Sequence, residues 1–414
     1  MKTMTAEQRK KTVLCADIGT SSLKTALIDE SGTVLAYKRQ RFDHNSPASM
    51  WFTALCVSVQ EIAETTSFEH LSALSISGNG PTIAVQYSSG FTDIVLWNDA
   101  QFSHTTSYYK GSSLFIPRIL SYLKSSSSHT DKPVCFLSGP EYLVWQLCGE
   151  KTTLLPEKRF LPAYWTDTDI NNTGLSKSSF PPFILLGEKS GNLLPDVSKA
   201  MGLPLQYAPL PVFCAGPDFT SALIGTNTLK PGTICDRAGS SEGFNLCTER
   251  PLNSEEIRNL PSVIYPFFNA GILIPDSGIR FSTVKKTTEF ASSSYEDYVM
   301  YLLNNRHEKG YTQMIQLAQE CGKALNTLIS LYNKNMERRI TVTGGQARNN
   351  VWLQFKSSIM NAAIDIPSCT DAELLGNAAA AFYGLNIFPD LSTAASSLFS
   401  IEKTLYPDGD GNPQ

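Results

Sequence analysis

Short apolar runs separated by small polar residues open the chain and predict β-strands. The stretch VLCADIGTSSLKTALID, from Val13 to Asp29, places the turn Gly-Thr-Ser-Ser between two such runs. A second turn, Glu30–Gly32, precedes a third run, Thr33–Gln40. Short runs that end at clusters of Gly, Ser and Asp are typical of hairpins. We therefore expect three consecutive strands, with the first tight turn at residues 19–22.

The pattern then changes to helical spacing. Apolar residues three and four positions apart predict a helix over Trp51–Thr66, and the run Leu71–Gly78 predicts a strand after it. The runs IAVQYS and DIVLWND predict two more strands. This order indicates a mixed sheet with helices packed outside it. It also excludes a P-loop and a dinucleotide-binding loop, because both need a helix directly after the glycine-rich turn.

The middle of the chain carries weaker patterns. Residues Ser103–Ser128 are predicted to be helical, with an interruption at Pro117. The segment Gly139–Gly149 has the pattern of a capped helix that ends at glycine. Residues Glu150–Pro209 are rich in Pro, Ser and Asn, and we expect loops with one or two helices there.

The strand-and-turn pattern returns at Pro211 and indicates a second, related half. PVFCAG predicts a strand, Pro217–Gly225 predicts a helix, and GTICDRAGSSEGFNLCTERP predicts strand, turn and strand. A long amphipathic helix is predicted over Tyr311–Lys334, followed by the strand RRITVTGG and the helix NNVWLQFKSSIMNAA. Six apolar residues mark the expected buried face of the long helix: Met314, Leu317, Ala318, Cys321, Leu325 and Leu328. Each half therefore has a hairpin with hydroxyl side chains at its tip.

Composition narrows the class of protein. The 414 residues allow two or three domains, and a net charge of −4 argues against a nucleic-acid partner. The nine cysteines form no C-x-x-C pair, which fits a reducing cytoplasm and neither a zinc ribbon nor a disulfide framework. We find no secretion signal and no apolar run of about 18 residues, so we expect a cytoplasmic protein without a membrane span.

The two hairpin tips are candidates for phosphate binding. Backbone N–H groups and short hydroxyls suit phosphate oxygens, and two facing tips could clamp a di- or triphosphate. Asp17 precedes the first tip and would repel a phosphate, but it can hold Mg²⁺ or the waters of the ion. The alternative is that each tip is only a turn. The segment TGGQARNN favours a nucleotide, because Gly344-Gly345 before a helix lets a flat ring approach the backbone.

Five motifs, in order along the chain, resemble the FGGY carbohydrate kinase family, xylulokinase-like members above all. They are DIGTSSLKTALID, LWND, AGPDFTSALIG, the GSS turn and TGGQARNNVWLQFKSSIMNAAI with ELLGNAAAAFYG. The match is clear over residues 13–100, 211–247 and 338–385. The resemblance implies an α/β fold of the actin/Hsp70/hexokinase superfamily: two ribonuclease-H-like (actin-like ATPase) domains with mixed sheets and a nucleotide cleft between them. We expect these domains at residues 10–228 and 229–405, the second shortened.

The resemblance also implies the roles of individual residues. Asp218 falls on the family's catalytic base, which accepts the proton of a sugar hydroxyl as its oxygen attacks the γ-phosphorus of ATP; the alternative is a helix N-cap. Asp17 would help to hold Mg²⁺. The candidate phosphate-binding residues are Gly19, Thr20, Ser21, Ser22, Gly239, Ser240 and Ser241. The candidates beside the adenosine are Gly344, Gly345 and Asn349. The candidate substrate residues are Asn79, Gly80, Trp97, Asp99 and Phe219. Trp97 fits a place in the core equally well.

Three features depart from the family. Where members place Gln-Met-His or Gln-Arg-Glu after the strand LSISG, this chain has Asn79-Gly80-Pro81, so hydrogen bonds that select a familiar sugar are missing. Gln101 stands where a basic residue commonly follows Asp99. Residues Pro251–Lys309 match poorly, and the chain is shorter than typical members.

We conclude from the sequence that the protein is an ATP-dependent kinase of a small sugar or polyol, with Mg²⁺ as cofactor. The alternative is a non-catalytic, nucleotide-binding regulatory protein that lost the sugar pocket. The acceptor sugar and the assembly, a homodimer included, stay open. GSSEG fits a hydrolase elbow with Ser241 as nucleophile, but such an elbow needs a helix after the turn. Asp236 before the second tip is either a second metal-site acid or a solvent-facing carboxylate. No metal spacing links the histidines: His44, His70, His104, His129 and His307.

Overall fold

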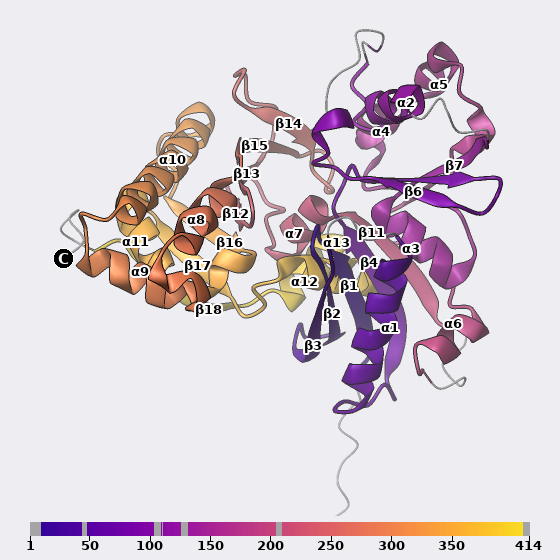
Figure 1. Ribbon diagram of the computed structural model, residues 1–414, viewed down its shortest axis with the longest axis horizontal. Helices are drawn as coiled ribbons and strands as arrows, with labels where there is room; N and C mark the ends of the chain where they lie inside the picture. Colours follow the sequence, from indigo (N-terminus) through magenta and orange to yellow (C-terminus); the bar gives the residue numbers. More distant parts are fainter. Residues whose placement is uncertain are drawn as a thin grey trace, which may run out of the picture. The chain divides into compact units, whose positions relative to one another are not determined.

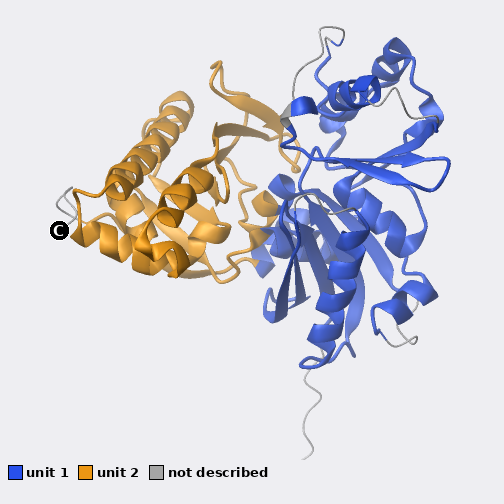
Figure 2. Ribbon diagram, in the orientation of Figure 1, with its two compact units in different colours: residues 1–221, 373–398 blue, residues 222–372, 399–414 orange. Residues whose placement is uncertain are grey.

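The computed structural model describes residues 10–43, 48–102, 109, 111–125, 131–203 and 209–408 (Figure 1). The chain forms two compact units (Figure 2). Unit 1 comprises Met1–Ser221 and Glu373–Leu398, and unit 2 comprises Ala222–Ala372 and Phe399–Gln414. The predicted domain boundary, between residues 228 and 229, lies near the point after Ser221 where the chain first passes from unit 1 to unit 2. The prediction did not include the return of residues 373–398 to unit 1.

A six-stranded mixed sheet forms the centre of unit 1, in the order β10-β11-β4-β1-β2-β3. Its strands are β1 (Thr12–Ile18), β2 (Ser22–Asp29), β3 (Val34–Arg41), β4 (Leu71–Gly78), β10 (Lys189–Asn192) and β11 (Pro211–Pro217). The β1–β2 and β2–β3 pairs are antiparallel, whereas β4 runs parallel to β1 and β11 parallel to β4. The three predicted strands and the tight turn after β1 are confirmed.

The burial of each strand follows its sequence pattern. Every residue of β1 is buried, as expected for the near-continuous apolar run of a central strand that is covered on both faces. The edge strand β3 alternates between partly buried and exposed residues along VLAYKRQR. Helix α1 (Ser49–Ala63) packs on β2 and β3, and α3 (Gly139–Cys148) packs on β4 and β11 (Figure 1).

Helix α3 has the caps that its sequence predicted. The Ser138 hydroxyl accepts the Glu141 backbone N–H, and the Glu141 carboxylate accepts the Ser138 N–H at 2.8 Å. Gly149 ends the helix in the left-handed region, at φ 77°. Pro117 does not interrupt a helix as predicted. It lies in the first turn of α2 (Ile116–Ser125), where its missing N–H costs no hydrogen bond.

Residues 150–203 of unit 1 contain more regular structure than predicted. They form α4 (Leu161–Tyr164), α5 (Asp167–Thr173) and α6 (Pro195–Ala200), besides the short parallel strands β8 (Thr153–Leu155) and β9 (Phe183–Leu185). Aromatic rings pack together there and order the segment: Phe115, Tyr164, Trp165, Phe180 and Phe183. A separate antiparallel sheet contains β5 (Ile83–Tyr87), β6 (Thr92–Val95) and β7 (Pro133–Ser138).

A seven-stranded sheet forms the centre of unit 2, in the order β14-β15-β13-β12-β16-β17-β18. Its strands are β12 (Ile234–Ala238), β13 (Glu242–Thr248), β14 (Arg258–Pro261), β15 (Phe268–Ile274), β16 (Arg339–Thr343), β17 (Ala363–Pro367) and β18 (Ile401–Leu405). The sub-order β15-β13-β12-β16-β17 repeats β3-β2-β1-β4-β11 of unit 1, with the same two antiparallel and two parallel pairings. The predicted relation between the two halves is thus confirmed at the level of topology.

Four helices pack around the sheet of unit 2: α8 (Ser277–Lys286), α9 (Tyr295–Asn304), α10 (Lys309–Tyr332) and α11 (Asn350–Met360). All six apolar residues predicted for the buried face of α10 are buried. Three further helices are α7 (Asp218–Gly225), which crosses from unit 1 into unit 2, and α12 (Ala372–Gly384) and α13 (Leu391–Leu398), which return to unit 1. Among the described residues, no helix is long and apolar enough to cross a membrane.

Candidate active site

The tip between β1 and β2 presents small polar groups at its surface. Thr20 is half-buried and Ser21 is exposed, and the Gly19 N–H donates to the Ser22 carbonyl at 2.9 Å to close the turn. Ser22 is buried, and its hydroxyl accepts a hydrogen bond from Arg39 Nε at 2.9 Å. Gly19, Thr20 and Ser21 are therefore the predicted phosphate-binding residues of this tip that can reach a ligand directly.

Asp17 lies near the end of β1 and is held from both sides. Its Oδ1 accepts a hydrogen bond from the Ser77 hydroxyl at 2.9 Å, and Lys24 Nζ lies 3.5 Å from its Oδ2. Lys24 also lies 3.7 Å from Glu373 Oε2. Lys24 and Glu373 were not predicted from the sequence. Lys24 could have been predicted from the hairpin register. Residues directly opposite each other on an antiparallel pair share a face, and Asp17 pairs with Lys24.

Three segments meet at one edge of this sheet. The parallel register places Ile18 beside Gly78 and Gly78 beside Pro217, so β1, β4 and β11 end together. The next residues along each strand are Gly19, Asn79 and Asp218. The crevice outside the carboxyl ends of parallel strands is the usual ligand site of open α/β sheets. The structure of unit 1 thus brings the first tip, the substrate-loop candidate and the proposed base to the same edge.

A hydrogen-bonded network joins the first tip to the substrate-loop candidates. Thr20 Oγ1 accepts the Trp97 indole N–H at 3.1 Å and the Asn79 side-chain amide at 3.4 Å. The Thr82 hydroxyl donates to Asn79 Oδ1 at 3.0 Å and accepts the Trp97 backbone N–H at 3.1 Å. Trp97 is half-buried, so it does not simply fill the core. Gly80 lies against Pro217, next to Asp218, and a Cβ built on it would stand 3.4 Å from the Pro217 ring.

Arg118 supplies a basic group near Asp99, where the sequence has Gln101. Its guanidinium, carried by α2, donates to the carbonyl of Leu96 at 3.0 Å and to that of Trp97. Burial lowers the pKa of Arg118, and the charge of Asp99 opposes this shift. Arg118 was not predictable from the sequence, because no local pattern connects α2 to the turn at Trp97. The last substrate candidate, Phe219, packs near Phe160, with ring centroids 6.4 Å apart.

Asp218 is the first residue of α7 and is half-buried. It stands inside the helix rather than at the residue before it, where an N-cap side chain acts. Helix α12 packs closely against α7 at Gly376. A Cβ on Gly376 would stand 1.9 Å from the Ser221 carbonyl oxygen, so only glycine lets the two helices come this close. The Asn377 side-chain amide donates to the Ser77 hydroxyl at 3.0 Å and to the Ala16 carbonyl at 2.9 Å. One helix therefore supports both Asp218 and Asp17.

The tip between β12 and β13 in unit 2 is tied to α8. Ser240 is exposed, and its carbonyl accepts the Gly278 N–H at 3.0 Å. The Ser241 hydroxyl accepts the Asp276 N–H at 3.0 Å. A Cβ on Gly278 would stand 2.3 Å from the Gly239 carbonyl oxygen, so the start of α8 abuts the tip. Because strand β13 follows Ser241 directly, the turn is not a nucleophile elbow, as expected.

The adenosine-segment candidates lie beside this second tip. Gly344 has φ 93°, and a Cβ on it would stand 2.7 Å from the Ala238 carbonyl oxygen. No atom lies within 4 Å of a Cβ built on Gly345, so its backbone is open to a ring. Asn349 caps α11 by accepting the Trp352 N–H at 3.0 Å, and Gln346 Nε2 donates to the Gly239 carbonyl at 3.3 Å.

Asp236 is neither a solvent-facing carboxylate nor a metal-site acid. It is fully buried and accepts a hydrogen bond from Lys356 Nζ at 2.5 Å, and Lys356 also donates to Glu242. We call these three residues the ion cluster. The Cys321 thiol donates to Glu242 Oε2 at 3.3 Å. Burial raises the pKa of Asp236 to about 7. The positive charge of Lys356 opposes this shift, and the negative charge of Glu242 adds to it. Lys356 was not predicted as their partner, because it lies far along the chain on α11.

The ion cluster predicts a pH-dependent stability. The pKa of Asp236 rises from 3.8 to about 7 on folding, so the folded chain binds the extra proton between these values. The free energy of unfolding should therefore fall as pH rises from about 4 through 7. The neighbouring charges are Lys356, Glu242 and Arg237, besides the Cys321 thiol. Urea unfolding at pH 5 and pH 8 checks this: Asp236→Asn should lose less stability over the interval than the unmodified chain. Equal losses would contradict it.

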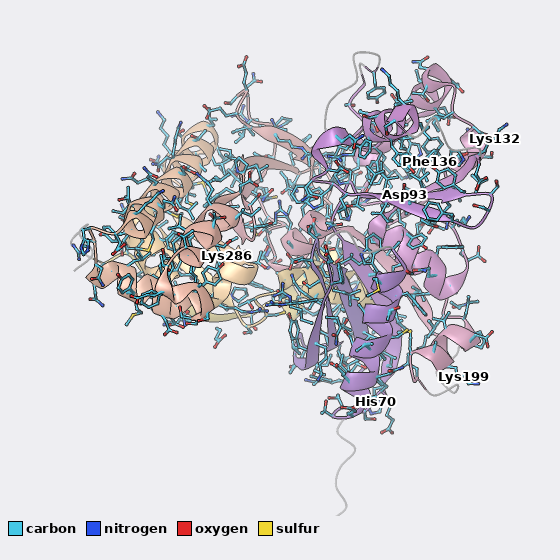
Figure 3. The ribbon with its side chains drawn as sticks, in the orientation of Figure 1. His70, Asp93, Lys132, Phe136, Lys199 and Lys286 are labelled. Atoms are coloured by element: carbon cyan, nitrogen blue, oxygen red, sulfur yellow. The ribbon has the colours of Figure 1, made fainter. Side chains whose placement is uncertain are left out.

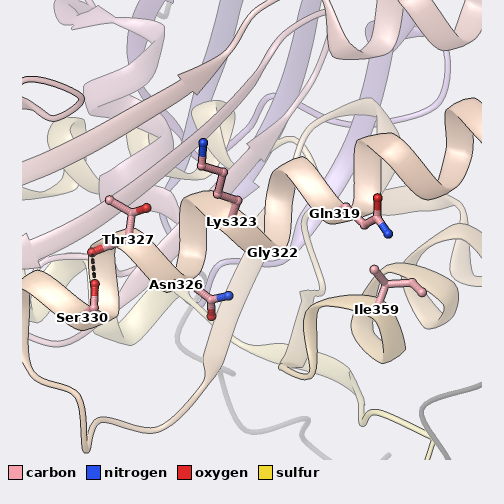
Figure 4. A pocket seen from close by; sticks show the side chains of 7 residues that line it. All are labelled: Gln319, Gly322, Lys323, Asn326, Thr327, Ser330 and Ile359. Atoms are coloured by element: carbon pink, nitrogen blue, oxygen red, sulfur yellow. Dashed lines mark hydrogen bonds between the residues drawn. The ribbon is translucent and has the colours of Figure 1, made fainter.

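The remaining candidates do not add a second site. Among the described residues, no group of three or more His, Cys, Asp or Glu could hold a metal ion. His70 lies at the amino end of β4 (Figure 3), whereas Asn79 follows the carboxyl end of that strand. His307 is exposed in unit 2. The other three histidines lie outside the described residues. A groove along α10 contains none of the predicted site residues (Figure 4). Its lining residues are Gln319, Gly322, Lys323, Asn326, Thr327, Ser330 and Ile359.

Comparison with known proteins agrees with the motifs. Residues 311–385 match the C-terminal domain of the FGGY family of carbohydrate kinases. The chain is 22% identical over 493 residues to the xylulose kinase of Bacillus subtilis (strain 168), covering 96% of this chain and 93% of that protein. The fold matches the ligand-bound xylulose kinase of Lactobacillus acidophilus with TM-score 0.77 at 15% identity, covering 97% and 94% of the two chains.

A further solved structure, the glycerol kinase of Plasmodium falciparum with ADP, matches with TM-score 0.76 at 14% identity, covering 96% of this chain and 94% of that chain. Similarity at these identities establishes the fold, and the predicted two-domain, actin-like α/β fold is thus confirmed. The shared fold and the family match over residues 311–385 together confirm the resemblance that the motifs predicted. In sequence and in fold, the chain is similar to the FGGY carbohydrate kinases.

Proposed function

We propose that the protein is an ATP-dependent carbohydrate kinase that phosphorylates a hydroxyl group of a small ketose or polyol. The meeting of Gly19, Asn79 and Asp218 at one edge of the unit 1 sheet carries this proposal. A phosphate-binding tip, a polar loop and a half-buried carboxylate are the groups that phosphoryl transfer to an alcohol requires. The similarity to named sugar kinases over most of the chain supports the same reaction class.

In this proposal Asp218 is the general base. Its carboxylate accepts the proton of the acceptor hydroxyl, whose oxygen bonds to the γ-phosphorus of ATP while the bond to the leaving ADP breaks. The backbone N–H groups and hydroxyls of Thr20 and Ser21 hold phosphate oxygens in place, while the Gly19 N–H closes the turn through the Ser22 carbonyl. Asp218 stands at the amino end of α7, where the helix dipole stabilises a carboxylate.

The second tip and the segment after β16 would bind the rest of the nucleotide. Gly239 and Ser240 are exposed, and Ser240 offers its N–H and hydroxyl groups to phosphate. The Gly239 N–H donates to the Ser241 carbonyl, and the Ser241 hydroxyl accepts the Asp276 N–H. The open backbone at Gly345 suits a flat adenine ring, and Asn349 stands at the start of the next helix. That both tips act on one nucleotide stays a prediction.

The residues around Asp17 suit a hydrated Mg²⁺. Mg²⁺ is usually held through one or two carboxylates, several waters and the substrate phosphates, so it needs no cluster of protein ligands. Asp17 is only 3% exposed and already accepts from Ser77, which favours contact through water. When bound, the ion would neutralise charge on the phosphates. Lys24, beside Asp17, would limit how much further positive charge the site accepts.

The loop after β4, which holds the candidate substrate residues Asn79 and Gly80, differs from the family pattern. Asn79 is 5% exposed, and its side chain is occupied by Thr20 and Thr82. Gly80 adds no side chain, so this loop provides few hydrogen bonds to a sugar, and selection must come from groups such as Trp97 and Asp99. We propose a ketose or polyol acceptor without naming one. A homodimer and a cytoplasmic location stay predictions.

A sugar panel tests the proposal and separates it from the regulatory alternative. ADP release from ATP and Mg²⁺ is measured with pentuloses, including xylulose, and with hexuloses and polyols including glycerol. We expect one class to raise ADP release at least tenfold over the rate without sugar. If nucleotide binds and no sugar changes its turnover, the chain is a nucleotide-binding protein and the kinase proposal fails.

A further inference from the structure

The ion cluster grips both strands of the second phosphate hairpin. Asp236 lies on β12 just before the tip, and Glu242 is the first residue of β13 just after it. Lys356 Nζ donates to both carboxylates, from the middle of α11. All three side chains are fully buried, so no solvent weakens the attraction between them. Lys356 thus connects α11 to the strand before the tip and to the strand after it.

The same helix starts at the adenosine-segment candidates. Asn349 caps α11, and Gln346 in the preceding turn donates to the Gly239 carbonyl at the tip. Gly344 packs against Ala238, the last residue of β12. Phosphate-tip and adenosine-segment candidates are therefore linked twice: at the surface through Gln346 and Gly344, and in the core through Lys356.

Stability alone is a weak explanation for this arrangement. Desolvation of buried ions offsets much of their attraction, and apolar side chains of similar size often stabilise a core as well or better. In some proteins, buried polar or ionic groups instead hold one particular arrangement of their elements. The cation–carboxylate contacts stand where such an orientation matters, at the base of a tip whose N–H groups must point at phosphate.

Building on the proposed function, we propose that Lys356 is a positioning residue for the nucleotide: through Asp236 and Glu242 it holds the second tip in register with the segment from Gly344 to Asn349. The residues of this tip and segment touch the ligand, and Lys356 acts through them. Its loss should therefore weaken the binding of nucleotide but not that of sugar, whose candidate residues all belong to unit 1.

The test measures ADP affinity by titration calorimetry and KM values for ATP and for the active sugar. Lys356→Met should raise the Kd for ADP and the KM for ATP at least tenfold, and leave the KM for sugar within about twofold. Arg339→Met is the matched control. It removes the Arg339–Asp365 ion pair, with contacts of 2.6 and 2.7 Å, at the end of β16 remote from Gly344, and should leave ADP affinity unchanged.

Lys356→Met leaves two buried carboxylates without their cation and could fail to fold. A charge-neutral variant keeps the inference testable in that case. The combination Asp236→Asn, Glu242→Gln and Lys356→Met removes every charge of the ion cluster, so it should fold and still bind ADP at least tenfold more weakly. The inference is overturned if a folded variant binds ADP like the unmodified chain, if Arg339→Met loses as much affinity, or if the neutral variant does not fold. Absence of ADP binding by the unmodified chain would instead refute the proposed function itself, and the inference with it.

Discussion

Asp218→Asn should lower kcat for phosphoryl transfer by about a hundred- to ten-thousandfold, the usual contribution of a general base. Asparagine keeps the size of the side chain at the start of α7 but cannot accept the hydroxyl proton. The Kd for ADP should stay within about twofold, because Asp218 belongs to the acceptor side of the proposed reaction. Rates with saturating ATP and the active sugar from the panel, together with ADP titration, check both expectations.

The matched control is Asp167→Asn. Asp167 is the first residue of α5, as Asp218 is of α7, but its side chain is 69% exposed and pairs with Lys177 at the surface. This variant should keep the full transfer rate, because it loses only a solvated carboxylate. If Asp218→Asn transferred phosphate as fast as Asp167→Asn, another group would have to be the base.

Gly376→Val should strongly destabilise unit 1. Any Cβ at this position would stand 1.9 Å from the Ser221 carbonyl oxygen and 2.9 Å from its Cα, and backbone atoms cannot turn aside as a side chain can. Helices α7 and α12 would have to separate, at a cost of about 3 kcal/mol or more in the free energy of unfolding. Urea unfolding measures the loss.

Gly345→Ala provides the comparison for Gly376→Val. Nothing lies within 4 Å of a Cβ on Gly345, so its free energy of unfolding should change by less than about 0.5 kcal/mol. A Gly376→Val variant as stable as Gly345→Ala would show that α12 does not fix α7 as described. The support for Asp218 would then have to come from elsewhere.

Features that depend on neighbours in sequence were predictable. The tight turns after β1 and β12 follow from apolar runs that stop at Gly, Ser and Thr, and the caps of α3 follow from Ser138 and Gly149. The buried face of α10 follows from its helical spacing. In each case the residues that decide the structure lie within a few positions of each other, so the pattern contains the answer.

Features that depend on distant partners were not predictable. Asp236 resembles an exposed strand-end acid until Lys356, 120 residues later, is packed against it. Arg118 reaches the turn at Trp97 from helix α2, 21 residues along the chain. The order within residues 150–203 depends on aromatic rings that meet only in the folded chain. Local pattern shows a side chain's type and its face, but not which element will cover that face.

The route of the chain has a practical consequence for dissecting the protein. The polypeptide passes between units after Ser221, after Ala372 and after Leu398, so no single cut releases an intact half. A fragment ending at Ser221 would lack α12 and α13, and with them Asn377, whose amide donates to both Ser77 and Ala16. Anyone wishing to study the amino-terminal lobe by itself would need to splice residues 373–398 back onto it through a linker.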